Sequence, residues 1–174
     1  MNLILIGYRG TGKSTVARLL ASRLGWESVS TDALIIERAK LPIPEIVSTF
    51  GWDHFRDLET AVCKDLQGKD HLIIDTGGGL ILRNVNVEAL KPGGVMCWLT
   101  ATVETISRRI AHDSQRPSLT SGKTFLEEIE EVLRERTPRY QAAADFFVET
   151  DSDSADQVAD RVLAKFRESR GFVP

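Results

Sequence analysis

The sequence predicts one α/β domain in which a parallel sheet is covered by helices on both faces. Short apolar runs alternate with helix-like segments along the 174 residues, and a glycine-rich loop joins the first run to the first helix. No internal repeat, low-complexity tract or linker divides the chain, and its length suffices to bury a substantial core. We therefore expect residues 1–174 to form a single domain.

Five runs have the length and composition of strands. They are Leu3–Ile6, Glu27–Ser30, Leu72–Asp75, Val95–Leu99 and Phe146–Glu149. The second run is the least apolar, and a Pro92-Gly93-Gly94 turn precedes the fourth. Because helix-like segments separate the runs, the strands are expected to lie parallel to one another.

Six segments carry apolar residues at helical spacing. They are Ser14–Leu24, Asp32–Ala39, Trp52–Gln67, Val103–Ile110, Phe125–Ala143 and Ala155–Arg170. Pro42 and Pro44 lie before the third of these segments, where they indicate a turn or loop. The segment 112–123 differs from its neighbours, because it is polar and contains a proline and a glycine between two good helices.

Composition and charge argue against several classes of function. A formal net charge of −3, from 22 basic and 25 acidic residues, offers no electrostatic argument for nucleic-acid binding. No apolar run reaches the length of a membrane span, and the chain enters its first strand too early for a signal peptide. Cys63 and Cys97 lie in apolar segments and are expected to be reduced core residues. We expect a cytoplasmic monomer that binds neither membrane nor nucleic acid.

Residues Gly7–Ser14 (GYRGTGKS) form a complete phosphate-binding loop (P-loop), G-x-x-x-x-G-K-[ST]. A chance glycine-rich turn is the alternative, but the flanking strand and helix are the context that the motif requires. The backbone N–H groups of Gly10, Thr11, Gly12 and Thr15 would surround a polyphosphate at the positive end of a helix. Lys13 would reach the β- and γ-phosphates, and the Ser14 hydroxyl would bind Mg²⁺. The loop predicts binding of a nucleoside triphosphate.

Polar groups follow two further strands at the edge of the sheet where such ligands bind. Asp32 comes after the second strand and could accept a hydrogen bond from an acceptor hydroxyl, as a base or as an orienting group. A helix cap is an equal alternative for this residue. The run Gly77-Gly78-Gly79 follows the third strand. A tight turn needs fewer glycines, so close backbone approach to a ligand is favoured.

Three arginines could complete an acceptor site. Arg56 lies three residues before Glu59, on one face of a helix, where a surface ion pair is the alternative. Arg116 lies in the segment 112–123, and Arg136 lies in a later helix. Guanidinium groups that converge would bind a carboxylate bidentately and stabilise a transferring phosphoryl group, although each alone is more often a solvated surface residue. The segment 112–123 is interpreted as a lid over the nucleotide rather than an inert loop.

The sequence resembles the shikimate kinases over nearly its whole length. The matching pieces, in order, are Gly7–Ser14, Asp32, Phe55-Arg56-x-x-Glu59, Thr76-Gly77-Gly78-Gly79, Arg116-Pro117-x-Leu119 and Arg136-x-Pro138-x-Tyr140. The combination is far more specific than any single piece. The resemblance implies a sheet with strand order 2-3-1-4-5 and transfer of the γ-phosphoryl group of ATP to the 3-hydroxyl of shikimate. That reaction belongs to the shikimate pathway of aromatic amino acid biosynthesis.

The resemblance also implies roles for individual residues. Asp32 would contact the shikimate hydroxyls, and residues 32–60 would form the substrate-binding region. Arg56 and Arg136 would hold the carboxylate in a pocket that Phe55, Glu59, Gly77, Gly78 and Gly79 help to form. Arg116 would span the lid and the reacting phosphates, and Arg109 would lie against the adenine. Lys13, Asp32 and Arg116 would form the catalytic set.

The sequence departs from the family at three positions. Ser30 replaces the first acid of a D-x-D pair that helps to hold Mg²⁺ in the family, and we hypothesise that Asp75 substitutes as an outer-sphere metal group. A loop-capping Asp75 is the alternative. Val47 replaces a frequent aromatic residue, and Ala155 stands where a proline is expected near the adenine. A kinase for another small hydroxy acid or for a nucleotide, and a nucleotide-binding module without catalysis, are the competing functions.

Overall fold

The computed structural model describes residues 1–111 and 124–169. Five parallel strands form one sheet in the order β2-β3-β1-β4-β5. Their bounds are β1 Asn2–Ile6, β2 Glu27–Ser30, β3 Leu72–Asp75, β4 Gly94–Thr100 and β5 Phe146–Glu149. All five predicted strands, their parallel direction and the strand order implied by the resemblance are therefore confirmed.

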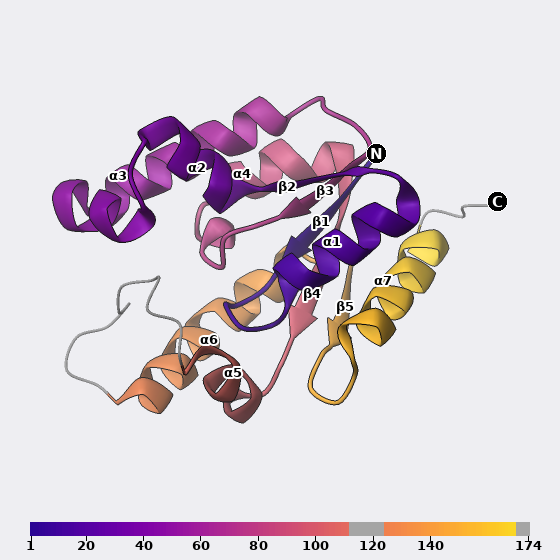
Figure 1. Cartoon of the computed structure of the whole chain (residues 1–174). Coiled ribbons are helices and arrows are strands. Elements are labelled where there is room, and N and C mark those ends of the chain that lie inside the picture. Colours follow the sequence, from indigo (N-terminus) through magenta and orange to yellow (C-terminus); the bar gives the residue numbers. More distant parts are fainter. Residues whose placement is uncertain (112–123, 170–174) are drawn as a thin grey trace.

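The helices pack on both faces of this sheet (Figure 1). Their bounds are α1 Lys13–Leu24, α2 Thr31–Ala39, α3 Ile43–Leu66, α4 Asn84–Leu90, α5 Val103–Ile110, α6 Phe125–Ala143 and α7 Ala155–Ser169. Single 3₁₀ turns cover Leu80–Leu82 and Lys91–Gly93. Among the described helices none is long and apolar enough to cross a bilayer.

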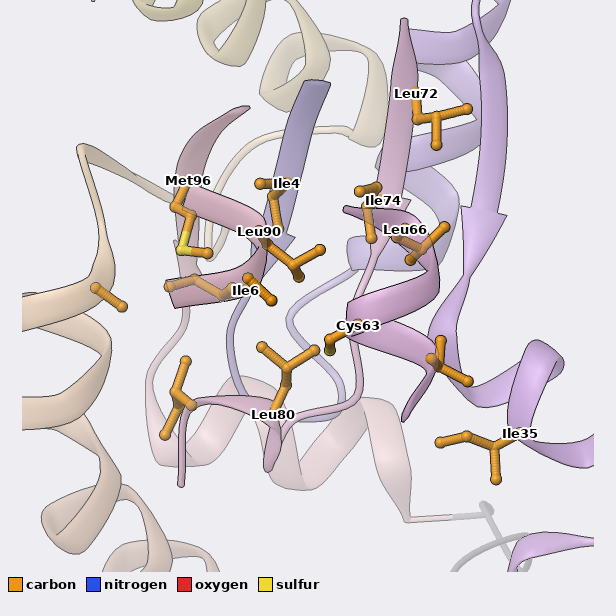
Figure 2. Close-up of a cluster of buried hydrophobic side chains, with 14 of the residues drawn as sticks. Ile4, Ile6, Ile35, Cys63, Leu66, Leu72, Ile74, Leu80, Leu90 and Met96 are labelled. Atoms are coloured by element: carbon orange, nitrogen blue, oxygen red, sulfur yellow. The ribbon is translucent and has the colours of Figure 1, made fainter. Parts of the chain in front are cut away.

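Alternation along the central strands divides the core into two layers. Ile4 and Ile6 of β1 point to the face that α3, α4 and α6 cover, and Figure 2 shows them with Ile74 of β3 and Met96 of β4. The intervening Leu5 of β1 points to the opposite face, where α1 and α7 pack side by side (Figure 1). Strands buried on both faces in this way are typical of parallel sheets.

The two cysteines lie in different layers, as expected for core thiols that do not form a disulfide. Cys63 of α3 belongs to the first layer and Cys97 of β4 to the second, and both are buried and free. Burial raises the pKa of the Cys63 thiol to about 12, so this side chain stays neutral and behaves as a small apolar group.

The third helix is longer than its sequence pattern indicates. It begins at Ile43 rather than Trp52, and Gly51 interrupts it with φ 85° and ψ 168°, so two helical segments meet there. The sequence prediction was wrong because Pro44 lies in the first turn, where a missing N–H costs no hydrogen bond. Helix α4 was missed because its sequence, NVNVEAL, alternates with a period of two rather than 3.6.

The register of the strands brings their carboxyl ends level. Asp75 of β3 is opposite Leu5 of β1 and opposite Ser30 of β2. The P-loop leaves β1 one residue after Ile6, at this same edge. The sheet thus places the P-loop next to the polar groups that follow β3, and those that follow β2 lie one strand further along the same edge. The predicted lid, residues 112–123, lies outside the described residues, as does Arg170, the last residue of the sixth predicted helix.

Candidate active site

The P-loop is closed around its own lysine. The Lys13 ammonium donates to the carbonyl oxygens of Gly7 at 2.8 Å and Tyr8 at 3.0 Å, and the side chain is buried. Gly10 has φ 81°, and a Cβ there would lie 2.6 Å from the Cγ2 of Ile110 in α5. Only glycine satisfies both the left-handed backbone and this close helix. The loop therefore holds a cation in place at the start of α1.

A wide cavity opens above the P-loop and the ends of β2 and β3. Thr11 does not line this cavity, because its hydroxyl points into the P-loop and donates to the Tyr8 carbonyl at 2.8 Å. The lining residues are Arg9, Gly10, Gly12, Lys13, Ser14, Thr15, Ser30, Asp32, Ala33, Ile36, Asp75 and Thr76. This cavity thus holds most of the predicted nucleotide-binding residues together with both predicted metal-binding residues.

Ser14 and Asp75, the two predicted metal-binding residues, are in direct contact. The Ser14 hydroxyl donates to Oδ2 of Asp75 at 2.6 Å. Ser30 lies opposite Asp75 in the β2–β3 register, but its hydroxyl accepts the Ala33 N–H at 3.2 Å and caps α2. The helix cap is therefore Ser30, and the alternative that Asp32 serves as the cap is wrong.

A second, smaller cavity adjoins the first. Its walls come from the P-loop, the start of α2, helix α3, the segment after β3 and helix α6. The lining residues are Tyr8, Arg9, Asp32, Ile43, Trp52, Phe55, Arg56, Glu59, Gly77, Gly78, Gly79 and Arg136. All eight residues predicted to bind the acceptor lie on this one cavity. We call it the acceptor cavity.

Arg56 and Glu59 form a buried ion pair in the wall of the acceptor cavity. Arg56 Nη1 is 3.0 Å from Glu59 Oε2, and the Glu59 side chain has no exposed surface. Burial raises the pKa of the Glu59 carboxyl, although the Arg56 guanidinium opposes this. Arg56 also lies over the rings of Trp52 and Phe55, at 5.4 and 5.1 Å from their centroids. The alternative of a surface ion pair is wrong, and the two rings give the cavity an apolar wall.

Arg136 brings a second buried positive charge into the same cavity. Its side chain is only 7% exposed, and Nη1 donates to the Gly78 carbonyl at 3.2 Å. The Tyr140 hydroxyl donates to the same carbonyl, and burial raises the pKa of Tyr140 to about 12, so it remains protonated. No carboxylate of the described residues forms a salt bridge with Arg136. A buried guanidinium without a counter-ion is costly unless a ligand supplies an anion.

The glycine run after β3 gives clearance to polar side chains. A Cβ at Gly79 would lie 2.3 Å from Nη2 of Arg56, although the backbone of Gly79 is not left-handed. A Cβ at Gly77 would lie 2.7 Å from Oδ1 of Asp32. The segment also turns, because the Leu80 N–H donates to the Gly77 carbonyl at 3.1 Å. The run therefore makes the turn and keeps space for the acceptor-side residues.

Four buried polar atoms of the acceptor cavity have no hydrogen-bond partner among the described residues. They are Tyr8 Oη, Arg9 Nε, Glu59 Oε1 and Arg136 Nε. Buried polar atoms are nearly always satisfied in native proteins, so such a group of exceptions indicates a ligand site. Tyr8 and Arg9 were missed as acceptor-side residues because they occupy the unspecified positions of the P-loop motif. Their place next to the loop's first glycine was the available signal.

Arg109 lies behind the P-loop. Its guanidinium donates to the Gly10 carbonyl at 3.1 Å and to the Thr150 hydroxyl at 2.9 Å and carbonyl at 2.5 Å. It thus ties the loop to the segment that follows β5. Arg116, the remaining predicted member of the catalytic set, lies outside the described residues.

A phosphate loop that shares the carboxyl edge of a 2-3-1-4-5 sheet with a cationic acceptor cavity is the arrangement of a small-molecule P-loop kinase. Sequence comparison makes the class more specific. The family model for shikimate kinase matches residues 9–167 of the chain. The chain therefore belongs to the shikimate kinase family.

Individual relatives agree with the family model. A shikimate kinase of Nitratidesulfovibrio vulgaris is 42% identical over 91% of each chain, and one of Syntrophus aciditrophicus is 39% identical over 97% of this chain and 92% of its own. The structure of the shikimate kinase from Acinetobacter baumannii in complex with shikimate matches with a TM-score of 0.92. It is 32% identical, covering 97% of this chain and 94% of that one. The predicted family, fold and ATP-dependent kinase activity are confirmed.

Proposed function

We propose that the two adjoining cavities transfer the γ-phosphoryl group of ATP to the 3-hydroxyl of shikimate. The observation that carries the assignment of the acceptor is the buried charge of Arg136, which forms no salt bridge with a described carboxylate, beside the Arg56–Glu59 pair. A small acid would supply the missing carboxylate, and Trp52 and Phe55 would contact its ring. Family membership supports shikimate as that acid.

The donor side follows from the P-loop. Gly10, Thr11, Gly12 and Thr15 would direct backbone N–H groups at the triphosphate, and Lys13 would exchange its carbonyl partners for phosphate oxygens. Arg109, which donates to the Gly10 carbonyl behind the P-loop, would lie against the adenine of ATP. Arg116, in the proposed lid 112–123, would add a second positive charge to the reacting phosphates, as the resemblance implies.

Asp32 is the group best placed to act on the acceptor hydroxyl. It lines both cavities, and it does not serve as the cap of α2. In the transfer, the hydroxyl oxygen forms a bond to the γ-phosphorus as the bond from phosphorus to the β–γ bridging oxygen breaks. The bridging oxygen leaves with the electron pair as part of ADP, and the hydroxyl proton passes to the Asp32 carboxylate. The protein's contribution is position and charge rather than a nucleophile.

We call the wide cavity above the P-loop the donor cavity, and its residues fit a Mg²⁺ ion. A hydroxyl and a carboxylate in contact, Ser14 and Asp75, are hard oxygen ligands of the kind Mg²⁺ prefers. Across residues 1–111 and 124–169 no group of three His, Cys, Asp or Glu side chains could hold a metal alone, so the ion would arrive with the nucleotide. When bound, Mg²⁺ neutralises charge on the β- and γ-phosphates.

Asp75 is expected to do the work of the acid that Ser30 replaces. Asp75→Ala should raise the Mg²⁺ concentration for half-maximal activity by about tenfold, since outer-sphere metal partners contribute at this level. Ser30→Ala should leave the Mg²⁺ titration unchanged and should lower the free energy of unfolding by about 1 kcal/mol through loss of the cap. Titrations at fixed ATP and thermal melts measure both effects. Two variants that titrate like the wild type would show that Asp75 has no part in metal binding.

The carboxylate clamp is tested by release of ADP with and without shikimate. Arg136→Met should raise the KM for shikimate about a hundredfold, because a buried charge loses its partner, and should leave the KM for ATP within about twofold. Arg139→Met is the matched control, because Arg139 lies three residues further along α6 and is exposed, outside the acceptor cavity. A clamp role fails if the two variants give the same KM for shikimate.

Competing acceptors are distinguished in the same assay. Nucleotides should support little ADP release, since they offer no carboxylate to two guanidinium groups. Gluconate has a carboxylate but no ring to contact Trp52 and Phe55, so it should support less ADP release than shikimate. A nucleotide-binding module would release no ADP with any acceptor.

We propose that the enzyme acts in the cytoplasm, where ATP is supplied, and as a monomer. The monomeric state is supported by two cavities lined by residues of one chain, and light scattering would test it.

A further inference from the structure

Arg9 lies at the boundary between the two cavities. Among the described residues, only Arg9 and Asp32 line both the donor cavity and the acceptor cavity. The γ-phosphoryl group must cross this boundary as it passes from ATP to the acceptor hydroxyl. A cation at the boundary is therefore beside the reacting atoms in the complex with both substrates.

The Arg9 side chain is held in place without being saturated. It is 12% exposed, and Nη2 lies 3.5 Å from Oε1 of Glu128 in the first turn of α6. Its Cζ is 5.9 Å from the ring centroid of Tyr8. The Glu128 contact is longer than a charge-assisted hydrogen bond, and the buried Nε has no hydrogen-bond partner among the described residues. A guanidinium with five donors thus retains capacity for an anion.

We infer that Arg9 is a catalytic residue that binds the equatorial oxygens of the transferring phosphoryl group. The inference rests on the proposed function and adds to it a second cation from the P-loop itself, next to Lys13. Negative charge spreads over those oxygens as the γ-phosphorus passes between the two reacting oxygens. A guanidinium already in position stabilises that charge without reorganisation. The competing role is a purely structural ion pair between the P-loop and α6.

Two variants and one control test the inference. Arg9→Met keeps the length of the side chain and removes the charge, and it should lower kcat by about a hundredfold or more. Arg9→Lys keeps a positive charge but lacks the planar guanidinium group with its paired N–H donors, and it should lower kcat by about tenfold. Arg38→Met is the control, because Arg38 pairs with Asp65 on the outer side of α2, away from both cavities. Its kcat should match the wild type.

A binding measurement separates transition-state contact from a structural role. The affinity for ADP with aluminium fluoride, in the presence of shikimate, should fall in Arg9→Met by about the same factor as kcat. The KM values for ATP and shikimate should change less than about threefold. Tryptophan fluorescence reports binding, since one of the three tryptophans, Trp52, lies on the acceptor cavity. Turnover of shikimate by the wild type and by Arg38→Met reports on the proposed function independently of Arg9.

Three results would overturn the inference. One is a kcat for Arg9→Met within about threefold of the wild type. Another is an unchanged kcat with a raised KM for shikimate, which would place Arg9 on the carboxylate instead. The third is equal loss of affinity for ATP and for the aluminium fluoride complex, which a merely structural ion pair would produce. If Arg9→Met does not fold, a wild-type kcat in Arg9→Lys would show that the transfer does not require the guanidinium group of Arg9.

Discussion

Replacement of Lys13 by methionine is expected to lower kcat by about a thousandfold, the largest effect of any single change in this chain. The buried ammonium donates hydrogen bonds to the carbonyls of Gly7 and Tyr8. Methionine has a similar length but leaves the β- and γ-phosphates without this charge. Because the Gly7 carbonyl also loses a donor, the free energy of unfolding should fall by about 1–3 kcal/mol. Single-turnover kinetics and thermal melts measure the two effects.

Lys64→Met is the control for the Lys13 variant. Lys64 is an exposed lysine in the last turn of α3, away from both cavities, so its loss removes the same charge from the chain. Its kcat and melting temperature should equal those of the wild type. If Lys13→Met retained more than a tenth of the wild-type kcat, the P-loop lysine would not stabilise the transferring group.

Asp32→Asn is expected to give the next largest loss, a fall in kcat of about a hundredfold to a thousandfold. Asparagine preserves the shape of the side chain but cannot accept the hydroxyl proton. Ser30 caps α2, so the free energy of unfolding should change by less than about 0.5 kcal/mol. The KM values for both substrates should change much less than kcat, because the lost interaction belongs mainly to the transition state.

Two comparisons make the Asp32 result interpretable. Asp65→Asn removes an exposed carboxylate that pairs with Arg38, and it should leave kcat unchanged. Ser30→Ala should lower stability while retaining kcat, the reverse of the Asp32→Asn pattern. A normal kcat in Asp32→Asn would assign the proton transfer elsewhere, and a large loss of stability would show that the Asp32 carboxylate also supports the fold.

The sequence predicted the parts of the two cavities that lie at strand ends. Asp75 is the last residue of one predicted strand, and Asp32 and the run Gly77-Gly78-Gly79 each begin two residues after a predicted strand. The carboxyl ends of parallel strands meet at one edge, and the register places Asp75 level with the end of β2. Arg136 was expected at the site through the resemblance, since nothing in its local pattern distinguishes a buried arginine from a solvated one.

Other features could not be predicted from local patterns. The start of α3 depends on Pro44, whose effect differs between a helix interior and a first turn. Ser30 and Asp32 are both good capping residues, and only the path of the backbone after β2 selects Ser30. Tyr8 and Arg9 fill positions that the P-loop motif leaves open. Their role on the acceptor cavity depends on α3 and α6, which are distant in the chain.

The amino-acid sequence alone determined the alternation of strands and helices, the P-loop and the family to which this chain belongs. These features depend on neighbouring residues, because apolar periodicity and glycine spacing act over a few positions. The tertiary structure decided which charges are buried and which cavities they share. It paired Arg56 with Glu59, buried Arg136 without a salt bridge to any described carboxylate, and set Arg9 at the boundary of the two cavities. Burial and charge compensation arise from segments that meet only when the chain folds, and so they could not be predicted from local sequence.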